Sequence, residues 1–295
     1  MSAPPTVLVV GEPLAELRAR ADGALDVGYS GDALNLAVRC ARGGATVELA
    51  TGVGDDRFSR ALLDLLGAEG VSRRLVHCEP HGALGCYLVE VDGTGERHFT
   101  YWRSASPARR LVDALGPAAL AEAAATADVV MVSGVTLAVL DDPQRTALIE
   151  VLTHAARQGT RVVLDPNVRP RLWGSTEEAA RWVDAAVSAA TVVLASTQDL
   201  ALLDAVAAEW ATQVAELVVT DGAAPSRWWA GSAAGTVPVE PVGAVDTTGA
   251  GDAFDAAYVL ARVEGATVPE AVTAGHAAAR DAVGHPGGLR WPDRP

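Results

Sequence analysis

The chain has 295 residues, of which 49% are hydrophobic and 20% are charged, and its formal net charge is −14. This is the composition of a globular protein that is long enough to bury a large core. The acidic balance argues against nucleic acid as a partner, and no apolar run reaches the roughly 18 residues that a membrane span requires.

The N-terminus and the cysteines exclude further classes. The first residues, MSAPPT, lack the basic start and the apolar stretch of a signal peptide, so we expect a cytoplasmic protein. Cys40, Cys78 and Cys86 are an odd number without a CxxC pair, which favours buried, reduced thiols over a disulfide framework or a zinc site.

Six strand-like apolar runs end in glycine or polar residues and alternate with helical stretches rich in alanine and leucine. This alternation indicates an α/β fold with a mostly parallel central sheet flanked by helices on both faces. Ligands of such sheets bind beyond the carboxyl ends of the strands, where the polar residues collect. The predicted strands cover 6–12, 46–56, 128–134, 161–169, 191–196 and 216–222, and the helical stretches include Asn35–Arg42, Ser59–Glu69, Pro143–Gln158 and Thr176–Ala190.

Two segments break this alternation. Residues 12–30 lie between the first strand and the first helix, and residues 83–103 read as two strands around a turn at Asp92-Gly93-Thr94-Gly95. Both are better placed in a small β-structure that projects from the main sheet. Its role is interpreted as a lid that closes over the ligand edge. An edge hairpin or a dimer contact remains the alternative, and these roles are compatible.

The stretch DTTGAGD at 246–252 precedes a helical pattern over Ala253–Arg262, so a helix is predicted to begin near Gly251. Glycines ahead of a helix leave backbone N–H groups free, and with the helix dipole they form a site for an anion such as a phosphate. Asp252 would repel that anion. The repulsion makes sense if Asp252 accepts the proton of a hydroxyl that attacks a phosphate. The alternative is an ordinary helix cap with Asp252 in the first turn.

Two common nucleotide-binding motifs are missing. GVGDDR at 52–57 begins like a dinucleotide fingerprint, but Arg57 stands where the third glycine belongs. There is also no GxxxxGK[ST] loop. A nucleotide must therefore be held by other means.

DTTGAGD resembles the C-terminal signature of the ribokinase-like (PfkB) sugar kinases, and residues 30–59 resemble their N-terminal glycine-rich region. The similarity runs from VVGE at 9–12 to HPGGL at 285–289. It implies one ribokinase-like α/β domain over residues 1–295, with ATP as the phosphoryl donor and Mg²⁺ bridging its phosphates. Catalysis of such a transfer is largely positioning and charge stabilisation. By this resemblance Asp252 is the base, and the backbone amides of Gly249, Ala250, Gly251 and Asp252 hold the developing charge.

Two further stretches resemble segments of 2-keto-3-deoxygluconate kinases, namely GERHFTYWRSASPARRL at 95–111 and DPNVRPRLW at 165–173. The resemblance implies phosphorylation of a primary hydroxyl of a sugar acid, and a planar guanidinium suits the carboxylate of such a substrate. Arg103 and Arg169 could each instead be surface cations, and Tyr87 and Tyr101 could be packing residues. The substrate-binding residues implied are Gly31, Asp32, Asn35, Tyr87, Tyr101, Arg103 and Arg169, together with Asp252.

For the nucleotide, the resemblance places Asn167 and the strand end Thr220-Asp221-Gly222 along the phosphates and the ribose. It places His276 and His285 near the adenine. Gly249 and Gly251 are placed at the phosphates. A homodimer through the lid is implied at the level of the family.

The sequence departs from the family pattern in three places. ASTQDL at 195–200 replaces an N-x-x-E-like stretch whose Glu helps to organise Mg²⁺, so only Asp199 is a candidate for the metal. Ala253-Phe254-Asp255 stands where the family often has Ser-Phe-Asn, and His276 stands where Asn is expected.

Three functions therefore stay open. The first is an ATP-dependent kinase of 2-keto-3-deoxygluconate or of a close keto-deoxy sugar acid. The second is the same transfer to a neutral sugar or a nucleoside, as in a fructokinase, ribokinase or adenosine kinase. The third is a catalytically weak protein that binds sugar and nucleotide on the same scaffold.

Overall fold

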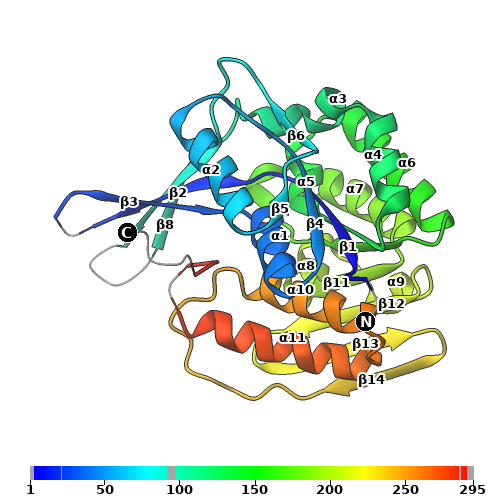
Figure 1. The fold of residues 1–295 in the computed structure, drawn as a ribbon. Coiled ribbons are helices and arrows are strands. Elements are labelled where there is room, and N and C mark those ends of the chain that lie inside the picture. The colour runs from blue at the N-terminus through cyan, green and yellow to red at the C-terminus, as the bar shows by residue number, and fades with distance from the viewer. Residues whose placement is uncertain (1–2, 21, 92–96, 286, 291–295) are drawn as a thin grey trace.

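The computed structural model describes the chain except for residues 1–2, 21, 92–96, 286 and 291–295. One large sheet runs through the molecule (Figure 1), and its central strands are parallel. An antiparallel hairpin extends the β12 edge, whereas β4, β5 and β6 form the other side. The strands are β1 (Thr6–Val10), β4 (Thr46–Val53), β5 (Val71–Ser72), β6 (Val76–Cys78), β9 (Val129–Ser133), β10 (Arg161–Asp165), β11 (Val192–Ser196), β12 (Glu216–Asp221), β13 (Ala224–Ala230) and β14 (Ala233–Val237). Their order is β14-β13-β12-β11-β10-β9-β1-β4-β5, with β6 paired to β4.

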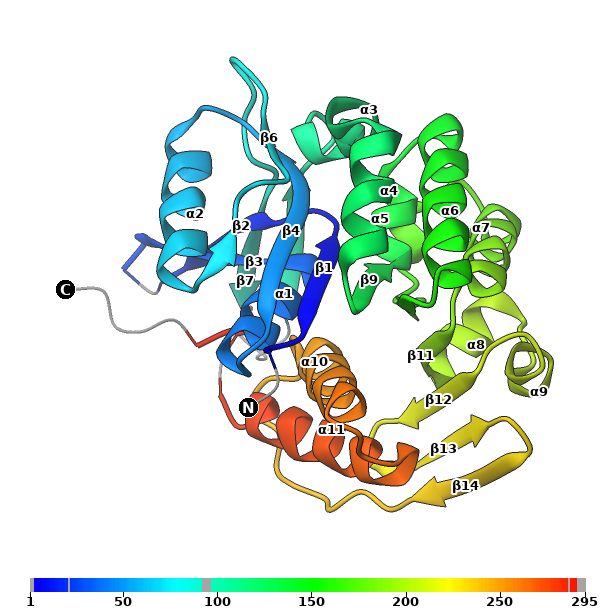
Figure 2. The same ribbon diagram turned by 45° about the vertical axis from the view of Figure 1, so that its right-hand side comes forward.

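The central strands are apolar on both faces because helices cover both faces. In β1, Val7 and Val9 belong to one hydrophobic cluster, whereas Leu8 and Val10 belong to the other. The first cluster contains residues of α1 (Asp32–Arg42), α2 (Arg57–Ala68), α10 (Ala250–Val263) and α11 (Val268–Val283). The second contains residues of α3 (Leu111–Leu115), α4 (Pro117–Thr126), α5 (Gly134–Val139), α6 (Asp142–Arg157), α7 (Thr176–Ala189), α8 (Thr197–Leu203) and α9 (Ala207–Ala211). Figure 2 shows the two sets of helices on either side of the sheet.

A second, smaller sheet projects from the main one, at the left of Figure 1. It consists of β2 (Leu14–Ala19), β3 (Leu25–Ser30), β7 (Cys86–Val91) and β8 (Arg97–Trp102), in the order β3-β2-β7-β8. We call these four strands the lid. Pairing is antiparallel except between β2 and β7.

The predicted α/β fold is confirmed, and the two segments that broke the alternation form the small projecting sheet. The turn predicted at Asp92–Gly95 lies outside the described residues. The β13–β14 hairpin was not predicted. Its strands, APSRWWA and AAGTV, are half-exposed at the edge of the sheet and lack the continuous apolar run of the buried strands.

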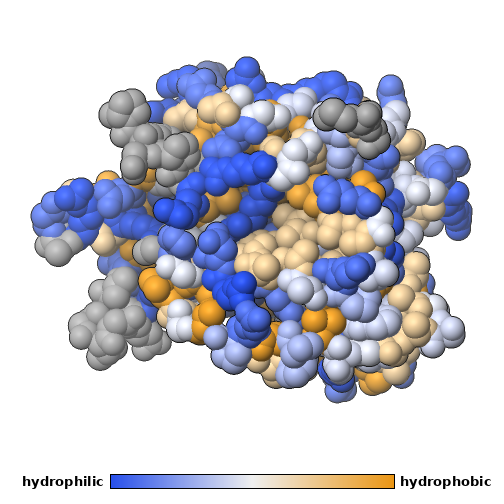
Figure 3. Space-filling model, turned by 60° about the horizontal axis from the view of Figure 1, so that its bottom comes forward, coloured by the Kyte–Doolittle hydropathy of each residue, from blue (hydrophilic) through white to orange (hydrophobic). Residues whose placement is uncertain are grey.

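The face of the molecule turned to the viewer in Figure 3 mixes hydrophilic and hydrophobic residues, with an apolar patch bordered by hydrophilic side chains. Within the described ranges, none of the helices has the length and apolar character needed to cross a membrane.

Candidate active site

The predicted helix after DTTGAGD is α10, which begins at Ala250 behind the N-cap residue Gly249. Other helices of the chain have side-chain caps: the Asp56 carboxylate accepts hydrogen bonds from Phe58 and Ser59 at the start of α2. Gly249 has no such side chain, its φ is 73°, and a Cβ on it would lie 2.7 Å from Gly288. The close approach of Gly288 and the left-handed backbone both require glycine at this position.

Gly251 plays a different part. A Cβ built on Gly251 meets no atom within 4 Å, so the space in front of this residue is open. The first backbone N–H groups of a helix have no acceptor within it. With no capping side chain, the start of α10 and its dipole face the open space at Gly251, which we call the cradle, and such a helix start suits a phosphate.

Asp252 lies in the first turn of α10 and is 8% exposed. Asn35 Nδ2 donates a hydrogen bond of 2.6 Å to Asp252 Oδ2. Burial, together with the nearby Asp32 carboxylate, raises the pKa of Asp252 to about 6. The Asn35 hydrogen bond and the charges of Arg39 and Arg169 act in the opposite direction. A buried carboxylate with a pKa near neutral pH is suited to general-base catalysis.

A pair of carboxyl groups lies beneath this site. Asp255 is one turn after Asp252 on α10, and Asp165 ends β10. Burial raises the pKa of both, and so does the negative charge of the neighbouring carboxylates, which favours a proton on the pair. The pair therefore brings less negative charge to the site than two free carboxylates would.

The first turn of α1 lies beside that of α10, because the two helices pack together. Gly31 is the N-cap residue of α1 with a φ of 109°, and a Cβ on it would lie 2.6 Å from the Glu12 carbonyl oxygen. Asp32 follows, and its carboxylate accepts hydrogen bonds from Ser133 Oγ and, at 3.3 Å, from Asn167 Nδ2. Asn35 Oδ1 is buried and has no hydrogen-bond partner among the described residues, which makes it available to a ligand hydroxyl.

The two arginines predicted to meet a carboxylate differ in their surroundings. Arg169, just past β10, is exposed, and no hydrogen bond or ion pair of its guanidinium is found in the part of the chain that the structure describes. Its charge lowers the pKa of Asp252, so it faces the site. Arg103 instead forms an ion pair with Glu12, which is 1% exposed. Arg103 was predicted to contact the substrate from the lid, and in the structure its charge is balanced within the protein by Glu12.

On the lid, Tyr87 and Tyr101 lie opposite each other in β7 and β8, with ring centroids 5.4 Å apart. Tyr87 is 6% exposed, and its hydroxyl donates a hydrogen bond to Glu16. Tyr101 is 48% exposed. Of the two, only Tyr101 presents a large surface to a ligand.

The lid is tied to the loop before α10. Arg97 of β8 forms an ion pair with Asp246, the first residue of DTTGAGD, and donates a hydrogen bond of 3.2 Å to Thr248. Asp246 also accepts hydrogen bonds of 2.8 Å from the amides of Thr248 and Gly287. Despite burial, these hydrogen bonds hold the pKa of Asp246 well below its usual range. This contact places the lid strand against the start of α10.

The residues predicted to meet the nucleotide lie at strand ends. Asn167 follows β10 with a φ of 34°, and its amide donates a hydrogen bond of 3.0 Å to Asp165. Thr220 and Asp221 end β12, and the Asp221 carboxylate accepts a hydrogen bond of 2.7 Å from Thr197. Gly222 follows with a φ of 56°. These residues share the carboxyl edge of the sheet with α10.

The two histidines lie on and just after α11. His276 Nε2 is 2.8 Å from Ser226 Oγ, and its ring packs on Phe254 at 5.5 Å, so it also joins α11 to β13 and α10. Burial lowers the pKa of His276. His285 Nδ1 lies 3.0 Å from the Asp281 carbonyl oxygen at the end of the helix.

The carboxylate of Asp199, the candidate for the metal, is hydrogen-bonded to other groups of the protein. Its carboxylate accepts hydrogen bonds from the amides of Val168 at 2.8 Å and Ser196 at 3.0 Å, and from Ser196 Oγ at 2.5 Å, as part of the capping box of α8. Across the described residues, no group of three or more His, Cys, Asp or Glu side chains could hold a metal ion. The geometry thus supports a structural role for Asp199.

Sequence reasoning missed several residues that shape the site. Arg39 lies one turn after Asn35 on α1, it donates a hydrogen bond of 2.7 Å to the Gly288 carbonyl, and its charge lowers the pKa of Asp252. The i, i+4 spacing from Asn35 is a signal that could have revealed it. The ion pair of Arg97 with Asp246 joins residues 149 positions apart, and no local pattern could have revealed it.

The comparisons with known proteins identify the family and the fold. The sequence pattern of the pfkB family carbohydrate kinases matches residues 6–293. The chain is 32% identical to the 2-dehydro-3-deoxygluconokinase of Escherichia coli over 301 aligned residues, and 30% identical to that of Dickeya dadantii over 300, with 96% of each chain covered. Its fold matches the crystal structure of a fructokinase with bound ATP from Xylella fastidiosa with a TM-score of 0.83 and 26% identity, over 96% of this chain and 93% of that one. The chain has a ribokinase-like fold and belongs to the pfkB family of carbohydrate kinases.

Proposed function

We propose that this protein phosphorylates the primary hydroxyl of 2-keto-3-deoxygluconate, or of a close keto-deoxy sugar acid, with ATP as the donor. The observation that carries the substrate assignment is the 32% identity with the Escherichia coli 2-dehydro-3-deoxygluconokinase along 96% of both chains. The observation that carries the reaction type is the position of Asp252 at the mouth of the open cradle in front of Gly251.

The residues present fit the phosphates of ATP, which supplies the phosphoryl group when bound. Gly251 leaves open space at the start of α10, where the amides of Gly249, Gly251 and Asp252 would meet the phosphates, whereas the Ala250 amide already donates a hydrogen bond of 3.3 Å to the Thr247 carbonyl. Asn167 and Thr220-Asp221-Gly222 would meet the phosphates and the ribose from the strand ends, with His276 and His285 on the adenine side. For Mg²⁺, the described side chains offer no group of three or more His, Cys, Asp or Glu ligands. The ion would be held mainly by nucleotide phosphates and water, as is common for Mg²⁺.

In this mechanism Asp252 is the general base. Asn35 occupies Asp252 Oδ2, and no hydrogen bond to Oδ1 is found among the described residues, so Oδ1 is the available acceptor. As the hydroxyl oxygen of the sugar bonds to the γ-phosphorus of ATP, the bond from that phosphorus to the bridging oxygen breaks and ADP leaves, while the hydroxyl proton passes to Asp252 Oδ1. The α10 amides stabilise the negative charge on the transferring group.

The sugar would lie between the lid and the first turn of α1. Asn35 Oδ1 is a buried acceptor for one of its hydroxyls, beside Gly31 and Asp32. Arg169 has no hydrogen bond or ion pair among the described residues, and its charge acts on Asp252. Because the sequence contains no lysine, its guanidinium is well suited to pair with the carboxylate of the sugar acid. Tyr101 would cover the sugar from the lid.

A neutral sugar is the second candidate. Arg103 is neutralised by Glu12, so only one of the two predicted arginines is free for a carboxylate. In addition, the chain is 29% identical to a fructokinase of rice over 258 residues. Both observations are compatible with a kinase of fructose or a similar sugar.

A coupled assay of ADP release separates these functions. The panel should contain a keto-deoxy sugar acid, a sugar acid without the keto group, fructose, ribose and adenosine. We expect the keto-deoxy acid to have a kcat/KM at least tenfold above every neutral sugar. A higher value for fructose or ribose would overturn the substrate assignment, whereas binding of sugar and ATP without ADP release would identify a catalytically weak binding protein.

We further propose that the lid closes over the substrate and forms a homodimer contact through its outer face. Leu25, Val27 and Trp102 lie on one face of the lid and are 51%, 44% and 53% exposed. Exposed apolar side chains of this size commonly mark an interaction surface. Light scattering should give the mass of a dimer for the natural protein and of a monomer for the W102E variant.

A further inference from the structure

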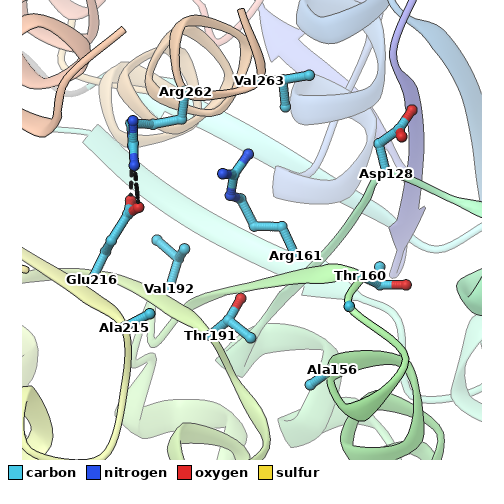
Figure 4. A pocket seen from close by; sticks show the side chains of 11 residues that line it. Asp128, Ala156, Thr160, Arg161, Thr191, Val192, Ala215, Glu216, Arg262 and Val263 are labelled. Atoms are coloured by element: carbon cyan, nitrogen blue, oxygen red, sulfur yellow. Dashed lines mark hydrogen bonds and ion pairs between the residues drawn. The ribbon is translucent and has the colours of Figure 1, made fainter. Parts of the chain in front are cut away.

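A second cleft lies at the opposite edge of the sheet from Asp252. It is formed where β9, β10, β11 and β12 begin, and the last turn of α10 closes one side (Figure 4). Its volume is about 430 Å³, which lies within the range of small-molecule sites. We call it the distal cleft, and its polar lining residues are Asp128, Thr160, Arg161, Thr191, Glu216 and Arg262.

The two acids of the distal cleft already have partners. Both oxygens of Glu216 are engaged by Arg262, and Tyr258 donates a hydrogen bond of 2.6 Å to Oε2. Asp128 Oδ2 accepts hydrogen bonds of 2.7 and 2.8 Å from the amide and the hydroxyl of Thr6. The charge of Arg161 also lowers the pKa of Glu216, but neither carboxylate forms a hydrogen bond or ion pair with Arg161 among the described residues.

The two threonine hydroxyl groups of the cleft also donate hydrogen bonds within the protein. Thr160 Oγ1 donates to the Ala124 carbonyl at 3.0 Å, and Thr191 Oγ1 donates to the Val162 carbonyl at 3.1 Å. Their hydrogens are therefore not available to a ligand. A ligand in the cleft must find its donors elsewhere.

Arg161 supplies those donors. It is the first residue of β10, it is half-buried, and no hydrogen bond, ion pair or ring contact of its guanidinium is found among the residues that the structure describes. Figure 4 shows its side chain inside the cleft, between the Arg262–Glu216 pair and Asp128. A half-buried cation without a direct partner is costly, and a planar guanidinium is suited to an oxyanion that accepts two hydrogen bonds.

We propose that the distal cleft binds a small oxyanion, a carboxylate or phosphate group on a short body, with Arg161 as its principal ligand. The remaining lining favours a compact and partly apolar body, because it consists of Ala156, Gly159, Val192, Ala215 and Val263. The cleft is separate from the proposed kinase site, since β10 runs from Arg161 to Asp165 and α10 runs from Ala250 to Val263. Each of these two elements thus has one end at the distal cleft and the other at the active site.

The test compares three proteins by isothermal titration calorimetry at low ionic strength, with inorganic phosphate in one arm and succinate in the other. The proteins are the natural chain, R161M, and the matched control R157M. Arg157 is exposed on the last turn of α6 and does not line the cleft. Phosphate that binds at the start of α10 contributes equally to all three proteins and therefore cancels.

We expect R161M to weaken binding in the cleft by at least tenfold in one or both arms, and R157M to bind as the natural protein does. Loss in the phosphate arm alone identifies a phosphate site, and loss in the succinate arm alone identifies a carboxylate site. Identical titrations of the three proteins in both arms overturn the proposal. If R161M does not fold, R161Q takes its place, and crystals of the natural protein soaked in each anion should show it within hydrogen-bond distance of Arg161.

Discussion

Asn35 and Asp252, 217 positions apart in the sequence, are joined by a hydrogen bond of 2.6 Å from Asn35 Nδ2 to Asp252 Oδ2. This contact links the first turns of α1 and α10 and orients the carboxylate of the proposed base. One oxygen is held by the protein and the other is left for the substrate hydroxyl.

Replacing Asp252 removes the proton acceptor and leaves the cradle intact. We expect D252A to lower kcat by about 10²–10⁴, the usual worth of a general base, with little change in KM. D252N keeps the shape of the side chain and should lose as much activity. Steady-state release of ADP in the presence of ATP and the favoured sugar measures kcat and KM of both variants. A D252N enzyme with normal kcat would remove Asp252 from the mechanism.

The pH profile should report the pKa of Asp252. Because the base acts when ionised, kcat/KM should rise with pH, reach half of its plateau near pH 6 and level off above that. Arg39 lowers this pKa by its charge, so R39M should move the rise to higher pH, whereas R39K should keep it near its original position. An unchanged profile in R39M would show that the titrating group is not Asp252.

Asp252 should also carry a cost in stability. Its pKa is raised from 3.8 to about 6, so the folded protein holds the proton more tightly than the unfolded chain, and stability falls as pH rises through this range. At pH values above both the folded and the unfolded pKa, the ionised Asp252 lowers the free energy of unfolding by on the order of 3 kcal/mol. Urea unfolding should find D252N more stable than the natural protein, by roughly 1 kcal/mol more at pH 8 than at pH 5. The reverse trend with pH would contradict the raised pKa.

The sequence was sufficient to predict the fold class, the lid segments and the helix after DTTGAGD, because each depends on local pattern. The strand runs are apolar over their whole length, and the glycines ahead of α10 are a local signal of a free helix start. The ion pair of Arg103 could not be predicted, because its partner Glu12 is 91 positions away. The hydrogen bonds of Asp199, the predicted candidate for the metal, could not be read from the sequence for a related reason. A carboxylate at the third position of α8 is as suitable for a capping box as for a metal, and only the surrounding amides decide between the two.

Replacement of the two arginines that were predicted to bind the substrate, Arg169 and Arg103, should have different effects on stability and on KM. Arg169 is exposed, so R169A should change stability by less than about 0.5 kcal/mol and raise KM for a sugar acid about tenfold, without effect on a neutral sugar. R103A leaves the Glu12 charge buried without its partner, which costs about 3–5 kcal/mol.

Thermal unfolding and KM measured on the same proteins separate the two effects. The double variant E12Q/R103A removes the buried charge as well, and should recover part of the lost stability. If R103A proved fully stable and only raised KM, Arg103 would be a ligand of the substrate, and its pairing with Glu12 would be secondary.

Gly249 and Gly251, two residues apart, should fail for different reasons when replaced by alanine. Gly249 has a φ of 73° and lies against Gly288, so G249A forces strain on the backbone and should lower the melting temperature. Gly251 is inside the helix and faces open space, so G251A should fold with equal or slightly higher stability, because alanine is the better helix former. Its methyl group would occupy the space in front of the α10 amides. We therefore expect G251A to raise KM for ATP and lower kcat at normal stability, whereas a G251A enzyme with full activity would place the phosphates somewhere other than the start of α10.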